Sequence, residues 1–208
     1  EQKMKKEEES RKEHTLWCER YRPLNLDSFV GNELVKEKTK QYINENDIPH
    51  ILLHGRAGGG KTTLAWILAR NINCEYLYIN ASSENSVDDV RTKITGFASS
   101  VGFRDLKIVI LDEADYLTPN AQAALRNVME TFSMHTRFIL TCNYIERIIE
   151  PIISRTQVYE LIPPSKKEVE YWGGDIPFVT AADLVDLYVS NRHARTFLTK
   201  NGLESGKT

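Results

Sequence analysis

The chain has 208 residues, of which 41% are hydrophobic and 27% are charged, a composition typical of a soluble globular protein. Its net charge of −2 excludes a global basic field, so any surface that binds nucleic acid must be local. The cysteines form no CxxC pair, which argues against a zinc site and against a disulfide framework. No apolar run is long enough to span a membrane and no secretory signal is visible, so we expect a cytoplasmic protein without a membrane partner.

The sequence predicts three segments. Residues 1–14 form a mixed-charge run with almost no apolar content, which predicts a solvated tail or a frayed helix. Residues 15–164 alternate short β-rich runs with helical patterns and form the predicted core domain. Residues 165–208 interrupt this pattern with glycine and proline and are expected to differ from the core.

The core domain has the pattern of an α/β fold. Short runs rich in β-forming residues predict five strands, at 51–54, 75–80, 107–111, 136–141 and 156–161. Amphipathic patterns predict helices at 61–72, 86–99 and 119–132. The third run is almost continuously apolar, as expected for a strand buried on both faces. Strands that alternate with helices predict a parallel sheet of five strands with helices on both sides.

The segment GRAGGGKT, residues 55–62, fits the pattern G-x-x-x-x-G-K-[ST] and lies between a predicted strand and a predicted helix. Glycines allow the backbone to wrap closely around a phosphate, and the following helix adds its unpaired N–H groups. We expect Lys61 to reach the β- and γ-phosphates of a nucleotide and the Thr62 hydroxyl to bind Mg²⁺. A flexible glycine-rich hairpin is the alternative, which the flanking elements disfavour. The predicted nucleotide-binding residues here are Gly55, Gly58, Gly59, Gly60, Lys61, Thr62 and Thr63.

Two acidic residues follow the predicted strand at 107–111. Asp112 falls at its carboxyl end, where ligands bind in open α/β sheets, and we expect it to hold Mg²⁺ directly or through water. Glu113 is suited to orient and deprotonate an attacking water, because phosphoryl transfer depends on positioning and charge neutralisation. Paired acids at a strand end are weak evidence alone, and a solvated acidic turn is the alternative. The preceding glycine-rich loop favours the catalytic interpretation.

Asn143 and Arg155 are the remaining catalytic candidates. Asn143 follows the fourth predicted strand, where we expect it to contact the attacking water or the γ-phosphate, although an Asn after a strand is usually a turn residue. Arg155 has no obvious phosphate partner within one subunit. We expect it to act on a neighbouring subunit as an arginine finger, which is worth roughly 10³ to 10⁵ in rate. Spacing alone does not exclude an ordinary surface arginine.

Together these motifs resemble an AAA+ ATPase, and longer strings resemble the small subunits of replication factor C of archaeal and phage type. These strings are LWCERYRPLNLDSFVGN, LTPNAQAALRNVMETFSMHTRFILTCNY and SRT, and the resemblance runs from about Leu16 to Val169. Two departures stand out. The family's loop usually has the sequence GPPGTGKT, whereas this loop contains Arg56, Ala57 and Gly59. Thr156 replaces the usual cysteine.

The resemblance implies a mechanism and a set of partners. Members of the family form a ring-like spiral with other clamp-loader subunits and bind ATP and Mg²⁺ at the subunit interfaces. They load a sliding clamp onto primer–template DNA, which implies a place in the replisome of a prokaryote or a phage-infected cell. By matching position, Tyr21, Arg22 and Pro23 lie against the adenine. Arg91 matches a position that faces DNA phosphates, with a solvated helix arginine as the equal alternative.

The C-terminal segment begins like the three-helix lid of that family and then departs from it. PPSKKEV carries a capping box, Ser165 with Glu168, which predicts a helix start. The next stretch, EYWGGDIPFVTAADL, has turn chemistry and resembles the DNA specificity subunits of type I restriction enzymes. We therefore expect the lid to be missing or replaced over 170–208. The alternative is a diverged lid helix over 183–198, with Arg192 or Arg195 in the role of the lid arginine.

Two functions follow from the sequence. The first is an ATP-hydrolysing clamp-loader subunit whose activity requires neighbouring subunits. The second is an ATP-binding fragment or chimera that does not turn over ATP and carries part of a DNA target-recognition domain. The core domain favours the first function, and the C-terminal segment favours the second.

Overall fold

The computed structural model describes residues 22–83, 87–163, 172–178 and 196–198. The chain separates into two compact units, one of residues 32–163 and the other of residues 1–31 and 164–208. Several predicted features lie outside the described residues, namely the charged tail at 1–14, the cap at Ser165 with Glu168, and the candidate lid arginines Arg192 and Arg195. Across the described residues, none of the helices has the length and apolar content needed to cross a bilayer.

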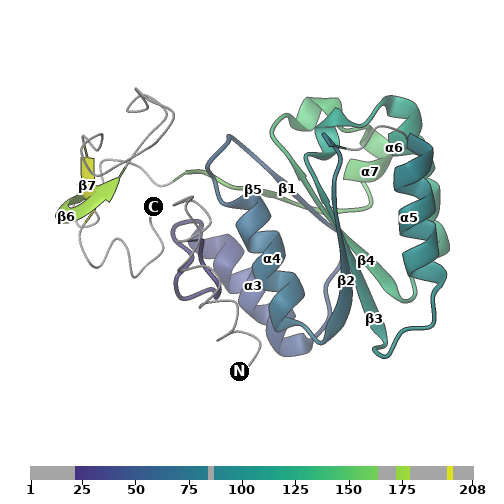
Figure 1. Cartoon of the computed structure of the whole chain (residues 1–208), viewed down its shortest axis with the longest axis horizontal. Helices are drawn as coiled ribbons and strands as arrows, with labels where there is room; N and C mark the ends of the chain where they lie inside the picture. The colour runs from purple at the N-terminus through teal and green to yellow at the C-terminus, as the bar shows by residue number, and fades with distance from the viewer. Residues whose placement is uncertain (1–21, 84–86, 164–171, 179–195, 199–208) are drawn as a thin grey trace. The chain divides into compact units, whose positions relative to one another are not determined.

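A parallel sheet of five strands forms the centre of the unit of residues 32–163 (Figure 1). The strand order is β2-β3-β4-β1-β5. All five predicted strands are present, with ends close to the predicted ones. They are β1 (Ile51–His54), β2 (Cys74–Asn80), β3 (Leu106–Asp112), β4 (Thr136–Cys142) and β5 (Gln157–Glu160).

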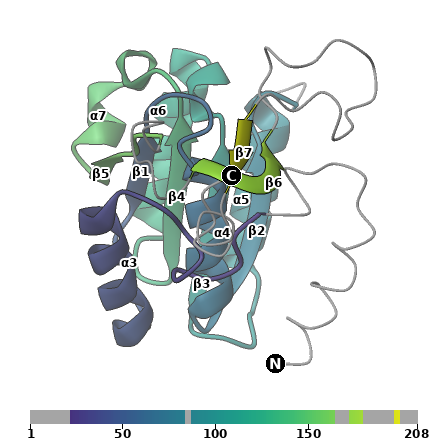
Figure 2. The ribbon, with the colours of Figure 1, turned by 90° about the vertical axis from the view of Figure 1, so that its left-hand side faces the viewer.

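Helices cover both faces of the sheet, as the sequence predicts (Figure 1, Figure 2). One face carries α3 (Glu33–Glu45) and α4 (Lys61–Asn71), and the other carries α5 (Val87–Ser99), α6 (Pro119–Thr131) and the short α7 (Glu150–Ile153). Short 3₁₀ helices follow two strands: η1 (Ala114–Tyr116) comes after β3, and η2 (Ile145–Arg147) comes after β4. The sequence did not predict α3, because only Val35 and Thr39 are buried along this polar helix.

The strand β3 is the best-buried part of the sheet. Its residues Ile108, Val109, Ile110 and Leu111 are all 0% exposed, which confirms the prediction of a strand covered on both faces. Val109 and Leu111 belong to the core between the sheet and the helices α5 to α7. Alternate residues of a strand point to opposite faces, so the other two lie on the side of α3 and α4. This double burial fixes the position of the residue that ends the strand, Asp112.

Polar contacts of α6 fix the chain between β4 and β5. Thr118 caps the helix, since its Oγ1 accepts a hydrogen bond from the Ala121 N–H at 3.3 Å. The buried Gln122 side chain donates to the Arg147 carbonyl at 2.8 Å and accepts from the Ile149 N–H at 2.8 Å. The helix therefore holds η2 and the start of α7 by side-chain hydrogen bonds.

In the other unit, β6 (Trp172–Phe178) pairs with β7 (Thr196–Leu198) in an antiparallel ladder. The prediction of a turn across WGGDIP is wrong, because this segment is extended and part of a strand. Both strands of a two-stranded ladder are edges, where proline is tolerated, and the register shifts between Trp172 and Ile176, where the glycines lie. Residues 196–198 are likewise a strand, whereas the diverged-lid alternative expected a helix there.

His50, just before β1, gives the unit of residues 32–163 a pH-dependent contribution to stability. Its Nδ1 accepts a hydrogen bond from the Phe138 N–H at 3.2 Å, and its ring packs edge-on against the Phe138 ring with centroids 5.5 Å apart. Burial, and after it the positive charge of Arg137, lowers the pKa of His50 below the ordinary 6.5. The folded protein therefore favours the neutral imidazole.

The imidazole of His50 binds a proton more tightly in the unfolded chain than in the folded protein. The stabilisation is therefore lost as the pH falls from about 6.5, the ordinary pKa, through the lower pKa of His50 in the folded protein. Urea unfolding between about pH 7 and pH 5 should show a falling free energy of unfolding. In His50→Gln this fall should be smaller, whereas His135→Gln, at an exposed position, should behave like the wild type. Identical pH profiles for His50→Gln and the wild type would contradict this account.

Candidate functional site

The glycine-rich loop joins β1 to α4, in the context that the sequence predicted. The helix begins at Lys61, and Gly60 before it has a left-handed φ of 83°. Gly55 lies so close to the chain after β5 that a Cβ there would collide with the Leu161 carbonyl oxygen. The loop therefore has a defined backbone that requires glycine at both positions. Gly58 and Gly59 lie within the loop, and Thr63 lies in the first turn of α4.

The Lys61 side chain lies over this loop. Its Nζ donates hydrogen bonds to the carbonyl oxygens of Gly55 at 2.8 Å and of Arg56 at 3.0 Å. The side chain is buried, and burial lowers the pKa of Lys61 from its ordinary value. An amine beside the first turn of α4 adds to the positive potential of the helix N-terminus. The loop is thus arranged to bind an anion.

Three hydroxyl groups donate hydrogen bonds to the buried carboxylate of Asp112 at the end of β3. Thr62 on α4 donates to Oδ1 at 2.8 Å, and Thr141 on β4 donates to the same oxygen at 2.5 Å. Tyr78 on β2 donates to Oδ2 at 3.0 Å. The structure therefore brings together Thr62 and Asp112, the two predicted metal-binding residues. The sequence analysis missed Thr141 and Tyr78, since only the strand register reveals them.

Glu113 and Asn143 lie in the turns that follow the neighbouring strands β3 and β4. Glu113 has a left-handed φ of 56°, a conformation that costs a residue with a side chain about 1–2 kcal/mol. Its N–H donates to the Thr141 Oγ1 at 3.1 Å. The buried Asp115 accepts from the N–H groups of Asn143 and Tyr144, each at 3.3 Å. The two turns are therefore tied together by side chains that the sequence analysis did not single out.

Arg155 follows α7, and its side chain bonds to residues of α6 and α7. Its Nη2 lies 2.7 Å from Oε1 of Glu130, and its Nε donates to the same oxygen at 2.8 Å. Its Nη1 donates to the Pro151 carbonyl at 2.8 Å. The side chain remains 40% exposed. The guanidinium is therefore oriented by its own chain and still accessible from outside.

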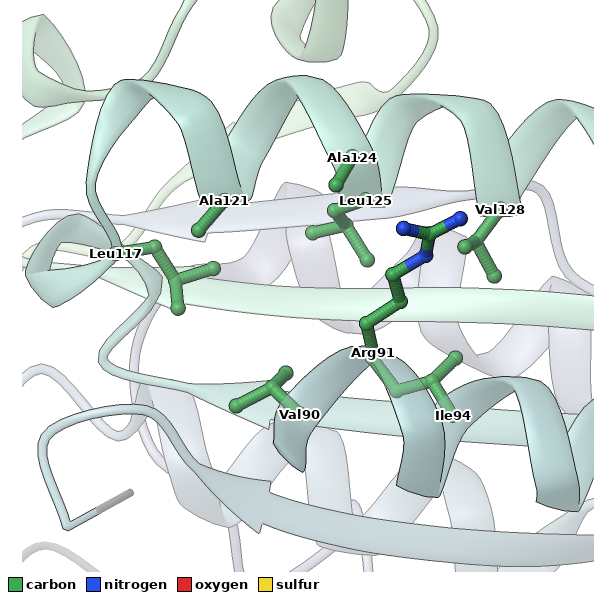
Figure 3. Close-up of a pocket in the computed structure, with 8 residues that line it drawn as sticks. All are labelled: Val90, Arg91, Ile94, Leu117, Ala121, Ala124, Leu125 and Val128. Carbon is green, nitrogen blue, oxygen red and sulfur yellow. The ribbon is translucent and has the colours of Figure 1, made fainter. Parts of the chain in front are cut away.

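Arg91 lies on α5 at the edge of an apolar groove between α5 and α6 (Figure 3). The side chain is exposed and reaches across the groove toward α6, so its aliphatic part covers apolar neighbours. The other residues that line the groove are Val90, Ile94, Leu117, Ala121, Ala124, Leu125 and Val128.

Of the three residues predicted to contact adenine, Tyr21 lies outside the described residues. Arg22 and Pro23 lie in an irregular segment of the unit that comprises residues 1–31 and 164–208. Their role stays a prediction.

The glycine-rich loop lies between β1 and α4, and the acidic pair lies at the end of β3, which is separated from β1 by one strand, β4. This arrangement defines the class of P-loop nucleotide-binding proteins. Residues 51–164 match the ATPase family associated with various cellular activities (AAA). This match covers more than half of the sequence, and the chain belongs to the AAA family.

Relatives within this family confirm the resemblance predicted from the sequence. The chain is 49% identical over 154 residues to the replication factor C small subunit of Natronomonas pharaonis, a match that covers 71% of this chain and 47% of the relative. It is 46% identical over 162 residues to the replication factor C small subunit of Archaeoglobus fulgidus, covering 74% of this chain and 51% of the relative. The chain spans about half the length of the curated relatives it matches.

Among solved structures, the fold is similar to the RuvB Holliday junction branch migration motor of Thermotoga maritima. The TM-score is 0.61 at 24% sequence identity, and the match covers 72% of this chain and 51% of that chain. At this identity the likeness concerns the fold alone. It confirms the predicted α/β fold, and the match to the AAA family confirms the AAA+ class. The resemblance of the C-terminal segment to restriction enzyme subunits stays a prediction.

Thr141→Val tests the hydrogen bonds that join β4 to the acidic pair. The substitution keeps the branched shape but removes the hydroxyl that serves both Asp112 and the Glu113 N–H. Because it takes a partner from two polar groups at once, we expect the free energy of unfolding to fall by about 1–3 kcal/mol in denaturant titrations. Thr141→Ser keeps the hydroxyl and should retain most of the stability. An equal loss in both variants would contradict the assignment, since it would indicate lost packing.

Proposed function

We propose that this chain is the ATP-binding core of a clamp-loader small subunit that helps to load a sliding clamp onto primer–template DNA. The observation that carries the proposal is the 2.8 Å hydrogen bond between Thr62 and Asp112, formed next to Lys61 at the start of α4. It joins the phosphate-binding loop to the acidic strand end, which is the geometry that Mg–ATP requires. The names of the relatives support this function over that of an ATP-binding fragment without turnover.

The donor atoms around Asp112 suit Mg²⁺. This ion prefers hard oxygen ligands, keeps several of its waters, and is usually bound by one or two carboxylates together with substrate phosphates. The Thr62 hydroxyl and the Asp112 carboxylate would hold it, directly or through water. The bound ion would supply neutralisation of the negative charge that develops on the phosphates.

Lys61 and the loop backbone bind the phosphates in this proposal. The Lys61 amine exchanges its hydrogen bonds to the carbonyls of Gly55 and Arg56 for bonds to the β- and γ-phosphate oxygens. The N–H groups of residues 58–63 face the phosphates because glycine permits the required turns and because the first turn of α4 leaves its N–H groups free.

Glu113 and Asn143 act on the attacking water. Glu113 accepts a proton from that water, and its left-handed backbone and the bond from its N–H to Thr141 hold it beside Asp112. Asn143 orients the same water or the γ-phosphate from the neighbouring strand end. Asp115 holds Asn143 in place by accepting a hydrogen bond from the Asn143 N–H.

The remaining predicted residues contact the adenine, the DNA or a neighbouring subunit in this proposal. Arg155 reaches the nucleotide of a neighbouring subunit in the ring, and its exposed guanidinium beside Glu130 supports this role. Tyr21, Arg22 and Pro23 contact the adenine, and Arg91 contacts DNA phosphates, two assignments that rest on the family resemblance. This function places the chain at the replisome, in the cytoplasm of a prokaryote or a phage-infected cell.

Lys61→Ala tests the nucleotide site. Removing a charged donor to the phosphates should weaken the binding of a fluorescent ATP analogue in Mg²⁺ by about 10-fold to 100-fold. Lys40→Ala, on the exposed side of α3, is the matched control and should bind like the wild type. Unchanged affinity in Lys61→Ala would overturn the assignment of the loop.

Arg155→Ala tests the role in a neighbouring subunit. ATP affinity should stay within about twofold of the wild type, while turnover in the ring assembled with partner subunits should fall by about 10³-fold. Arg126→Ala removes the other arginine that pairs with Glu130 and is the control for a merely structural effect. Wild-type turnover in the Arg155→Ala ring, measured by phosphate release, would count against the role in trans.

A further inference from the structure

We infer that Tyr78 is a positioning residue for the metal-binding carboxylate of Asp112, and that an aromatic stack formed by Trp66, Tyr76 and Tyr78 holds its phenol in place. The inference rests on the proposed function, in which Asp112 helps to hold Mg²⁺. The inference means that β2 and the middle of α4, and not only the phosphate-binding loop, contribute side chains that support the metal site.

The strand register places Tyr78 next to Asp112. Asn80 pairs with Asp112 across β2 and β3, and Tyr78 pairs with Ile110. Tyr78 and Asp112 are therefore diagonal neighbours on one face of the sheet, within reach of a long aromatic side chain. The Tyr78 hydroxyl donates to Oδ2 at 3.0 Å, whereas Thr62 donates to Oδ1.

The strand alone does not fix the phenol, because β2 is at the edge of the sheet and Tyr78 is 36% exposed. Trp66 on α4 stacks on the Tyr78 ring, with centroids 5.0 Å apart and planes inclined by 25°. The Tyr76 ring packs edge-on against the same indole, with centroids 5.6 Å apart and planes at 89°. The Arg70 guanidinium lies 5.0 Å from the indole centroid. These contacts restrict the rotation that would carry the Tyr78 hydroxyl away from Asp112.

The spacing along α4 links this stack to the phosphate-binding loop. Thr62, Trp66 and Arg70 are each four residues apart, so they lie along one stripe of the helix. Thr62 contacts Oδ1 directly, and Trp66 acts on Oδ2 through Tyr78. One helix, which begins at the loop, therefore controls both oxygens of the carboxylate.

A donor to Oδ2 fixes the rotation of the carboxylate. It thereby keeps Oδ1, which accepts from Thr62 and Thr141, at the start of α4, where the ion or its water would bind. Removing such an outer partner of a metal ligand typically costs 10-fold to 100-fold in metal affinity or activity. Losing the Tyr78 hydroxyl should therefore change the response to Mg²⁺ and leave metal-free nucleotide binding unchanged.

The test uses the full chain and a fluorescent ATP analogue titrated with Mg²⁺. In Tyr78→Phe the Mg²⁺ concentration for half-maximal binding should rise by about 10-fold. Analogue binding in EDTA should stay at the wild-type value, whereas the thermal unfolding midpoint should fall, because the buried Asp112 carboxylate loses one of its donors. Trp66→Leu, which removes the stack, should shift the Mg²⁺ midpoint in the same direction. Tyr76→Phe, which keeps its ring against Trp66, is the matched control and should titrate like the wild type.

A wild-type Mg²⁺ midpoint in Tyr78→Phe would overturn the inference. An equal loss of affinity with and without Mg²⁺ would overturn it too, because it would indicate a general structural role. Failure of the proposed function would appear separately, in the wild type: binding that does not depend on Mg²⁺ at all would remove the metal role of Asp112 and the inference with it.

Discussion

A buried carboxylate at the end of β3 is stable only because hydroxyl groups from three other elements donate hydrogen bonds to it. A charged group without such partners would be costly to bury. Asp112 receives bonds from α4, β4 and β2, so the positions of these elements are coupled at one side chain. The fully buried strand β3 supplies the rigid base, since it cannot move without disturbing the core on both faces.

The glycine-rich loop between β1 and α4 is held in place near Asp112 by contacts of its own. Gly55 packs against the carbonyl of Leu161, so the end of β5 limits how the loop can be arranged. Lys61 bonds to the carbonyls of the loop itself, and the next residue, Thr62, bonds to Asp112. A short run of sequence thus joins an anion-binding helix terminus to an acidic strand end, the combination that a nucleotide with its metal ion requires.

Much of this could be predicted from the sequence, because each signal was local. Strands β1, β3 and β4 contain clear apolar runs, and the loop and the acidic pair have characteristic spacings. The helix α3 was missed because it buries little, and the strand at Trp172–Phe178 because glycine and proline favour turns. Tyr78 and Thr141 could not be found locally, since their importance comes from the pairing of β2 with β3 and of β3 with β4. The role of Arg155 cannot be derived from one chain, because its proposed target belongs to another subunit.

The most direct test of the central claim is calorimetric titration of Asp112→Asn with a slowly hydrolysed ATP analogue, in Mg²⁺ and in EDTA. The account predicts that the wild type binds the analogue at least about 10-fold more tightly in Mg²⁺ than in EDTA. It predicts that Asp112→Asn, which keeps the size of the side chain but loses its charge, binds with similar affinity in both. Full Mg²⁺ enhancement in Asp112→Asn would contradict the claim that this carboxylate is the centre of the site.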